Sequence, residues 1–113
     1  MPSMDESWEM RNGLVIPNRS VLAAMTNKQS HADGTLSDEE MRFLLRRAEG
    51  GFGLITTAAS HVQESGQGWE GEFGVWGDHQ LPGLTSLATQ LKQHDSKSFV
   101  QIFHGGMRAP SSI

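Results

Sequence analysis

Short apolar runs, separated by polar or glycine-containing segments, recur along the chain and have the length of β-strands. They occupy residues 20–25, 52–59 and 97–103 and are rich in aliphatic, β-branched or aromatic side chains. The nearly continuous run at 20–25 predicts a strand that is covered on both faces. Asn12-Gly13 favours a tight hairpin turn with positive φ at both central positions, so a small N-terminal hairpin is expected ahead of these runs.

Two segments between the runs have helical periodicity. Ser37 and Glu40 have the spacing of a capping box, in which each side chain bonds to the backbone N–H of the other residue. Gly50-Gly51 then ends the first helix. The expected inner faces consist of Met41, Leu44, Leu45 and Ala48 in the first helix, and of Leu81, Leu84, Leu87, Ala88 and Leu91 in the second.

The resulting order, strand-helix-strand-helix-strand, predicts an α/β fold with a parallel sheet and right-handed crossovers. Such a sheet is either doubly wound or part of an eight-fold barrel. The 113 residues favour one domain over 1–113, and no segment has the apolar length of a signal peptide or membrane span. A cytoplasmic location is the default expectation. The net charge of -4 argues against nucleic-acid and membrane partners, and the absence of cysteine excludes disulfides.

Residues 60–80 form a long, glycine-rich segment that predicts an extended loop. Within it, Gly66, Gly68 and Gly71 match the spacing of a dinucleotide-binding motif, but no helix follows directly and two glutamates would repel a phosphate. The motif therefore predicts a flexible loop and not a nucleotide site. No metal site is expected either, because no histidine has a partner at helical ligand spacing; the five are His31, His61, His79, His94 and His104.

The carboxyl ends of the predicted strands are the candidate ligand edge, since parallel α/β folds bind ligands there. Small residues at 23–24 and 58–60 would let a flat ligand approach the backbone, and Gln101 offers a donor and an acceptor on one amide. These features suit the pyrimidine edge of a flavin. The same residues are also compatible with simple packing and turn capping, so the residues alone leave both interpretations open.

Several segments, in order, resemble the old yellow enzyme, or NADH:flavin oxidoreductase, family. Asn18-Arg19-Ser20-Val21-Leu22-Ala23-Ala24-Met25-Thr26 resembles the family's first strand, and Asp33-Gly34-Thr35-Leu36-Ser37 resembles the loop before its first helix. RRAEGGFGLITTAASHV at 46–62 resembles the end of that helix and the second strand, and Val100 to Gly106 resembles the third strand. The resemblance runs from about Asn18 to Pro110.

The resemblance implies a (β/α)8 TIM barrel that binds FMN, takes hydride from NADH or NADPH and passes it to a small enone-type substrate. The chain would be its N-terminal β-α-β-α-β portion, about three of the eight strands. By position, Ala23, Ala24, Met25 and Thr26 would line the flavin, with Thr26 near its C4 oxygen and N5. Ala59 would lie against the same edge, and Gln101 would hold the pyrimidine end.

Two departures from the family pattern change the expectation. Ala24 stands where the family usually has proline, which should loosen the binding geometry. An eight-fold barrel needs about 250 residues, so the chain is expected to be truncated after the third strand. The family's catalytic tyrosine and histidine pair then lie beyond Ile113, and no catalytic residue is assigned.

The sequence is also compatible with two other interpretations. The first is a non-catalytic fragment that self-associates through open sheet edges or pairs with a partner. A small doubly wound binding domain is the second, and it would require the glycine loop to bind a phosphate.

Overall fold

The computed structural model describes residues 3–112 and begins with the expected hairpin. Strands β1 (Trp8–Glu9) and β2 (Val15–Ile16) pair antiparallel. The turn differs from the predicted one, because Gly13 donates its N–H to the Met10 carbonyl at 2.9 Å and only Gly13, at φ 89°, is left-handed. The central position at Asn12 has an ordinary φ, so the loop is a turn followed by a left-handed glycine.

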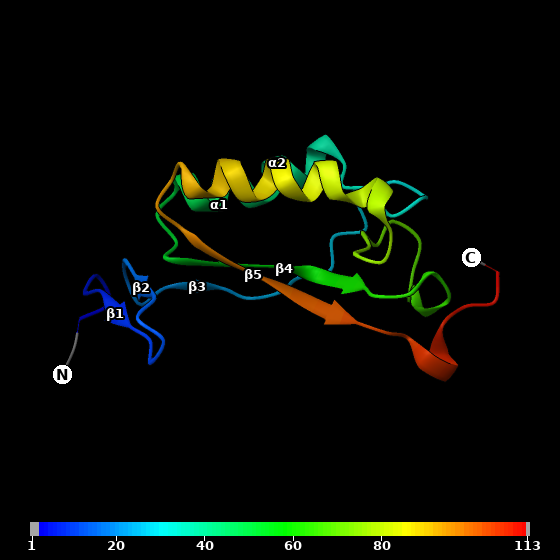
Figure 1. The fold of residues 1–113 in the computed structure, drawn as a ribbon, viewed down its shortest axis with the longest axis horizontal. Helices are drawn as coiled ribbons and strands as arrows, with labels where there is room; N and C mark the ends of the chain where they lie inside the picture. The colour runs from blue at the N-terminus through cyan, green and yellow to red at the C-terminus, as the bar shows by residue number, and fades with distance from the viewer. Residues whose placement is uncertain (1–2, 113) are drawn as a thin grey trace.

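Three parallel strands and two helices follow, in the predicted order (Figure 1). The bounds are β3 (Val21–Leu22), α1 (Asp38–Glu49), β4 (Leu54–His61), α2 (Leu81–Lys92) and β5 (Lys97–Phe103), with single 3₁₀ turns η1 (Glu64–Gly66), η2 (Asp78–Gln80) and η3 (Gly106–Arg108). The strand order is β3-β4-β5, and both helices cover one face of the sheet. The predicted α/β class and β-α-β-α-β succession are confirmed. That 1–113 is one domain stays a prediction, and residues 1, 2 and 113 lie outside the described residues.

The first strand is much shorter than the apolar run at 20–25 predicts. Only Val21 and Leu22 pair with β4, opposite Leu54 and Ile55. The prediction of cover on both faces was also wrong, because Val21 is 52% exposed while Leu22 is buried. The helices bury one face of β3, and no described element covers the other face.

The side chain of Asn18 holds β3 against the start of β4. Its Oδ1 accepts hydrogen bonds from the backbone N–H groups of Ser20 and Gly53, both at 3.0 Å. Its Nδ2 donates to the Gly51 carbonyl at 2.7 Å. Phe52 and Gly53 precede the strand, and β4 runs over 54–61 instead of the predicted 52–59.

Helix α1 begins and ends where its local signals predict. The Ser37 side chain accepts a hydrogen bond from the Glu40 N–H at 3.1 Å, and Gly51, at φ 107°, adopts the left-handed conformation after the last turn. The reciprocal half of the predicted capping box was wrong. The Glu40 carboxylate bonds to the hydroxyl of Ser30 and not to the backbone of Ser37.

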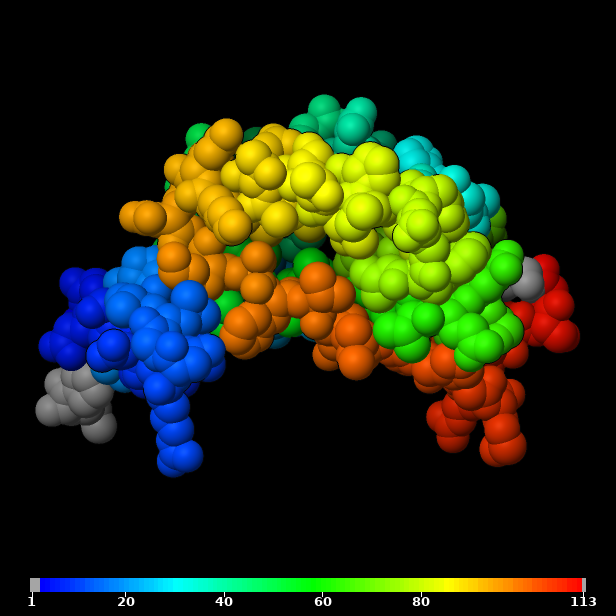
Figure 2. Space-filling model, in the orientation of Figure 1, coloured from blue at the N-terminus to red at the C-terminus, as the bar shows by residue number. Residues whose placement is uncertain are grey.

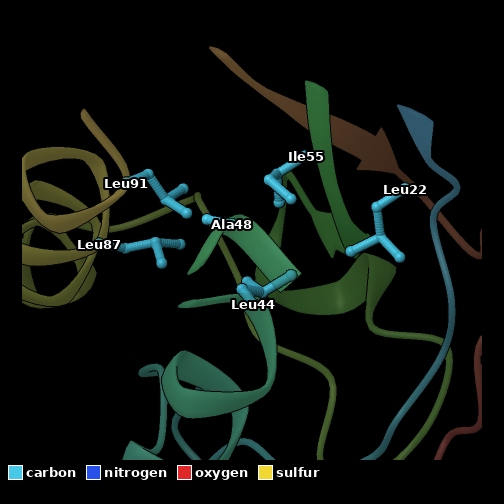
Figure 3. Packing of buried hydrophobic residues seen from close by; sticks show 6 residues of the cluster. All are labelled: Leu22, Leu44, Ala48, Ile55, Leu87 and Leu91. Carbon is cyan, nitrogen blue, oxygen red and sulfur yellow. The ribbon is translucent and has the colours of Figure 1, made fainter. Parts of the chain in front are cut away.

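The core lies between the helices and the sheet. It consists of Leu22, Leu44, Ala48, Ile55, Leu87 and Leu91 (Figure 3). Met41 and Leu45 pack against it, as the periodicity of α1 predicts. The stripe on α2 is narrower than predicted: Leu81 and Ala88 are exposed, because this helix contacts α1 and the sheet mainly through Leu87 and Leu91.

The opposite side of the molecule is hollow. Figure 2 shows an arch whose concave underside lies between the N-terminal hairpin and the C-terminal segment, with β5 residues along it. Among residues 3–112, no helix combines the length and the apolar character needed to cross a membrane.

Candidate functional site

A β-bulge in β4 turns Ala59 toward the concave side of the sheet. Ile55 packs into the core beneath the helices, and its partner on β5 is Ser98. Residues alternate between the two faces of a strand, so Gln101 faces away from the helices. The register then shifts, and Ala59 becomes the partner of Gln101. Without the extra residue of the bulge, Ala59 would have faced the helices together with Ile55.

Two hydrogen bonds of the Thr57 hydroxyl stabilise this bulge. The Thr57 hydroxyl donates to the Ala58 carbonyl at 2.9 Å and accepts from the Gln101 N–H at 3.2 Å. The hydroxyl oxygen thus replaces the backbone carbonyl oxygen of β4 that would accept a hydrogen bond from the Gln101 N–H in a regular sheet. The Gln101 side chain is exposed, and the small, buried Ala59 is its neighbour. A planar group resting on the concave face could therefore reach the Gln101 amide over Ala59.

The four remaining predicted site residues follow β3 in extended chain. Ala23, Met25 and Thr26 are exposed and Ala24 is half-buried. Pairing between β3 and β4 ends at Leu22, so no ladder bond is described between residues 23–26 and β4. The structure therefore makes Ala59 and Gln101 direct neighbours, whereas the 23–26 segment approaches β4 from its other side, next to β3.

The loop after β4 is shorter and better packed than predicted. Ser60 and His61 belong to β4, and His61 forms a bridge with Gly74. Trp69 packs on Phe103 of β5 with their ring centroids 5.2 Å apart. The prediction of a flexible loop is therefore replaced by a loop that folds back onto the carboxyl ends of two strands.

A buried histidine-glutamate pair lies one layer beyond Ala59. His61 pairs with Phe103 in the ladder, and its Nδ1 lies 3.4 Å from Oε1 of Glu72. Both residues are only 2% exposed. Sequence reasoning missed this pair, because it arises from the folding back of an irregular loop, which leaves no periodic spacing. The Gly68 N–H donates to the Glu72 carboxylate at 2.8 Å. This backbone amide of the glycine motif is therefore already hydrogen-bonded to a side chain of the same loop.

Burial acts in opposite directions on the pKa values of this pair. It raises the pKa of Glu72 above 4.5, opposed by the hydrogen bond from Gly68, and it lowers the pKa of His61 below 6.5, opposed by a hydrogen bond with the Phe73 backbone. The stability contributed by protonated Glu72 is therefore complete below pH 4.5 and is lost as pH rises through the raised pKa. The stability contributed by neutral His61 is complete above pH 6.5 and is lost as pH falls through the lowered pKa.

Glu72→Gln is expected to remove the first of these two pH dependences. The free energy of unfolding of the variant, relative to the original chain, should increase as pH rises above 4.5, because only the original chain must ionise a buried carboxyl. Urea denaturation over a pH series measures this difference. The exposed Glu70→Gln is the matched control in the same loop, and a parallel pH profile for both variants would contradict the assignment.

Comparisons with known proteins match one family over most of this chain. The family model described as the NADH:flavin oxidoreductase / NADH oxidase family matches residues 9–113. The probable NADH-dependent flavin oxidoreductase YqiG of Bacillus subtilis is 33% identical over 96% of this chain and 29% of its own length. An NADPH dehydrogenase of Bacillus licheniformis is 33% identical over 90% of this chain and 30% of its own length. The chain thus spans about three-tenths of these relatives.

Solved structures give the same fold. A 2-naphthoyl-CoA reductase in complex with 2-naphthoyl-CoA has a TM-score of 0.90 at 27% identity and covers 96% of this chain, which matches 16% of that structure. The old yellow enzyme homologue from Zymomonas mobilis has a TM-score of 0.87 at 22% identity, over 97% of this chain and 30% of that structure, and shows the fold alone. The sequence-based predictions of a partial TIM barrel and of FMN with NADH or NADPH agree with these relatives. The chain belongs to the NADH:flavin oxidoreductase / NADH oxidase family.

Proposed function

We propose that this chain forms the flavin-facing first β-α units of an FMN-dependent NAD(P)H oxidoreductase of the ene-reductase type. The observation that supports this most directly is the bulge that places Ala59 beside Gln101 on the concave face. In a closed barrel of parallel strands, residues at the carboxyl ends of several strands form the ligand site. When bound, FMN would supply the transfer of a hydride from NADH or NADPH to an alkene conjugated with a carbonyl group.

The residues of this segment would bind and orient the flavin. The exposed Gln101 amide can donate to a ring carbonyl and accept from a ring N–H, which fits a pyrimidine edge. Ala59 has no side-chain atoms beyond Cβ, so the ring can approach β4 closely. The extended chain of Ala23–Thr26 would supply backbone N–H groups and the Thr26 hydroxyl from the other side of the site. Ala24, where the family usually has proline, leaves this segment one more backbone donor.

No proton donor is assigned within this segment. In this proposal the 113-residue chain alone retains FMN weakly or not at all and is inactive, because its site is open on the concave side. The complete barrel would enclose the ring and exclude water. The substrate would be a small molecule with an activated alkene.

A barrel completed with a relative's strands tests this proposal. The 90% of this chain that matches the Bacillus licheniformis NADPH dehydrogenase replaces the corresponding 30% of that enzyme, and FMN binding is measured by quenching of flavin fluorescence. The chimaera is expected to bind FMN, and Gln101→Leu should raise its Kd roughly tenfold or more, since one or two buried hydrogen bonds are lost. Gln93→Leu, at an exposed position after α2, should leave the Kd unchanged. Equal Kd values for both variants, in folded chimaeras, would remove Gln101 from the site.

Self-association is the second candidate role. It is supported by the apolar side chains that β5 exposes, namely Phe99, Val100 and Ile102, and by the position of β5 at one edge of the sheet. The chimaera separates the two roles. A chain whose role is self-association would give a folded chimaera that retains no flavin.

A further inference from the structure

Glu40 is a buried acid whose carboxylate points away from its own helix cap. It lies in the first turn of α1 and is 1% exposed. Its carboxylate accepts a hydrogen bond from the hydroxyl of Ser30. Burial raises the pKa of Glu40, whereas the polar side chains of Ser30 and Asn27 act to lower it. A carboxylate in this place is also favoured by the amino terminus of the helix.

The segment that Glu40 contacts is held from a second side by the loop after β4. The Ser30 N–H donates to the Gly71 carbonyl at 2.9 Å. Gly71 lies so close to this segment that a Cβ atom on it would be 2.5 Å from the Lys28 carbonyl oxygen. Lys28 itself has a φ of 54°, a conformation that non-glycine residues seldom adopt without tertiary support. Residues 27–30 are therefore fixed between α1 and the loop.

We propose that Glu40 is a positioning residue that fixes residues 27–30 and, through them, the position of Thr26. Asn27 is the single residue between Thr26 and Lys28. The Ser30 hydroxyl bonds to the Glu40 carboxylate and the Ser30 N–H to the Gly71 carbonyl, so the chain just after Thr26 is held at two points. Under the proposed function, on which this consequence rests, Glu40 determines where the flavin meets the 23–26 segment without touching the flavin. A purely helix-capping acid would instead bond to the backbone N–H of Ser37, which Glu40 does not do.

Hydrogen exchange of the 113-residue chain, followed by NMR without FMN, tests the positioning role. In Glu40→Ala the Ser30 amide is expected to exchange roughly tenfold faster, because its segment opens locally, while the Ile55 amide of β4 keeps its rate. Ser30→Ala should likewise accelerate exchange of the amide at position 30, whose N–H donates to the Gly71 carbonyl, and it carries the test if Glu40→Ala does not fold. Glu40→Gln, which keeps an acceptor oxygen, should restore most of the protection. Glu39→Gln, an exposed neighbour of equal charge, is the matched control.

Unchanged exchange at residues 27–30 would overturn the proposal, and so would an equal acceleration across the whole sheet. The consequence for FMN is measured separately in the chimaera. There, Glu40→Ala should raise the FMN Kd roughly tenfold and shift the flavin absorption bands, with recovery in Glu40→Gln. If the unsubstituted chimaera binds no FMN, the proposed function fails, while the exchange rates still decide the role of Glu40.

Discussion

Ile55→Ala is expected to lower the free energy of unfolding by about 3 kcal/mol, because it opens a cavity in the middle of the core. Ile55 is completely buried and lies among Leu22, Leu44 and Leu91 (Figure 3). This core is small, so the side chains around Ile55 have little capacity to compensate. Urea denaturation followed by circular dichroism measures the change.

Ile102→Ala is the matched control for this prediction. It makes the same substitution in the same sheet, but Ile102 is 71% exposed. The change in unfolding free energy there should stay within about 0.5 kcal/mol. Comparable losses at both positions would mean that the core does not lie between helices and sheet as described.

Gly71→Ala is expected to destabilise the chain by about 3 kcal/mol. Two effects add: Gly71 has a φ of 85°, and the new Cβ would overlap the backbone oxygen of Lys28. Gly13→Ala separates them, since Gly13 has a similar φ of 89° but no atom within 4 Å of the added Cβ. It should cost about 1 kcal/mol.

The comparison of these two glycine variants is made by thermal and urea denaturation at one pH. A larger loss for Gly71→Ala identifies the contact between the loop after β4 and the chain after β3. Equal losses would show that only the left-handed conformation matters. The loop would then not be packed against Lys28.

Features that depend on neighbouring residues in the sequence were predicted well. Ser37 and Gly51 set the ends of α1 through bonds and conformations within a few residues, and the bounds of β5 match its apolar run. The alternation of strands and helices predicted parallel strands. A helix between two strands of one sheet usually forms a crossover, after which the second strand runs in the same direction as the first.

Features that depend on a distant partner were predicted poorly. The pairing of β3 with β4 stops after Leu22, although the apolar run continues to Met25. Glu40 bonds to Ser30 instead of its own cap, because the fold brings a hydroxyl to it. His61 and Glu72 meet only when the loop folds back. No periodicity in the chain encodes such contacts.

The residues of the candidate site were predicted, whereas the bulge that orients one of them was not. The resemblance supplied all six residues, and the strand ends alone suggested the same edge. The bulge at Thr57 could not be anticipated, since one extra residue reverses the face of everything after it while leaving composition unchanged. Simple alternation counted from Ile55 would have assigned Ala59 to the helix side.

The strand order β3-β4-β5, which repeats the order of synthesis, bears on how the chain is made. A ribosome adds roughly 5–20 residues per second, whereas helices form within about a microsecond. Each new β-α unit can therefore dock on a surface that has already left the exit tunnel. Folding can keep pace with translation, and no strand has to be inserted between two earlier ones.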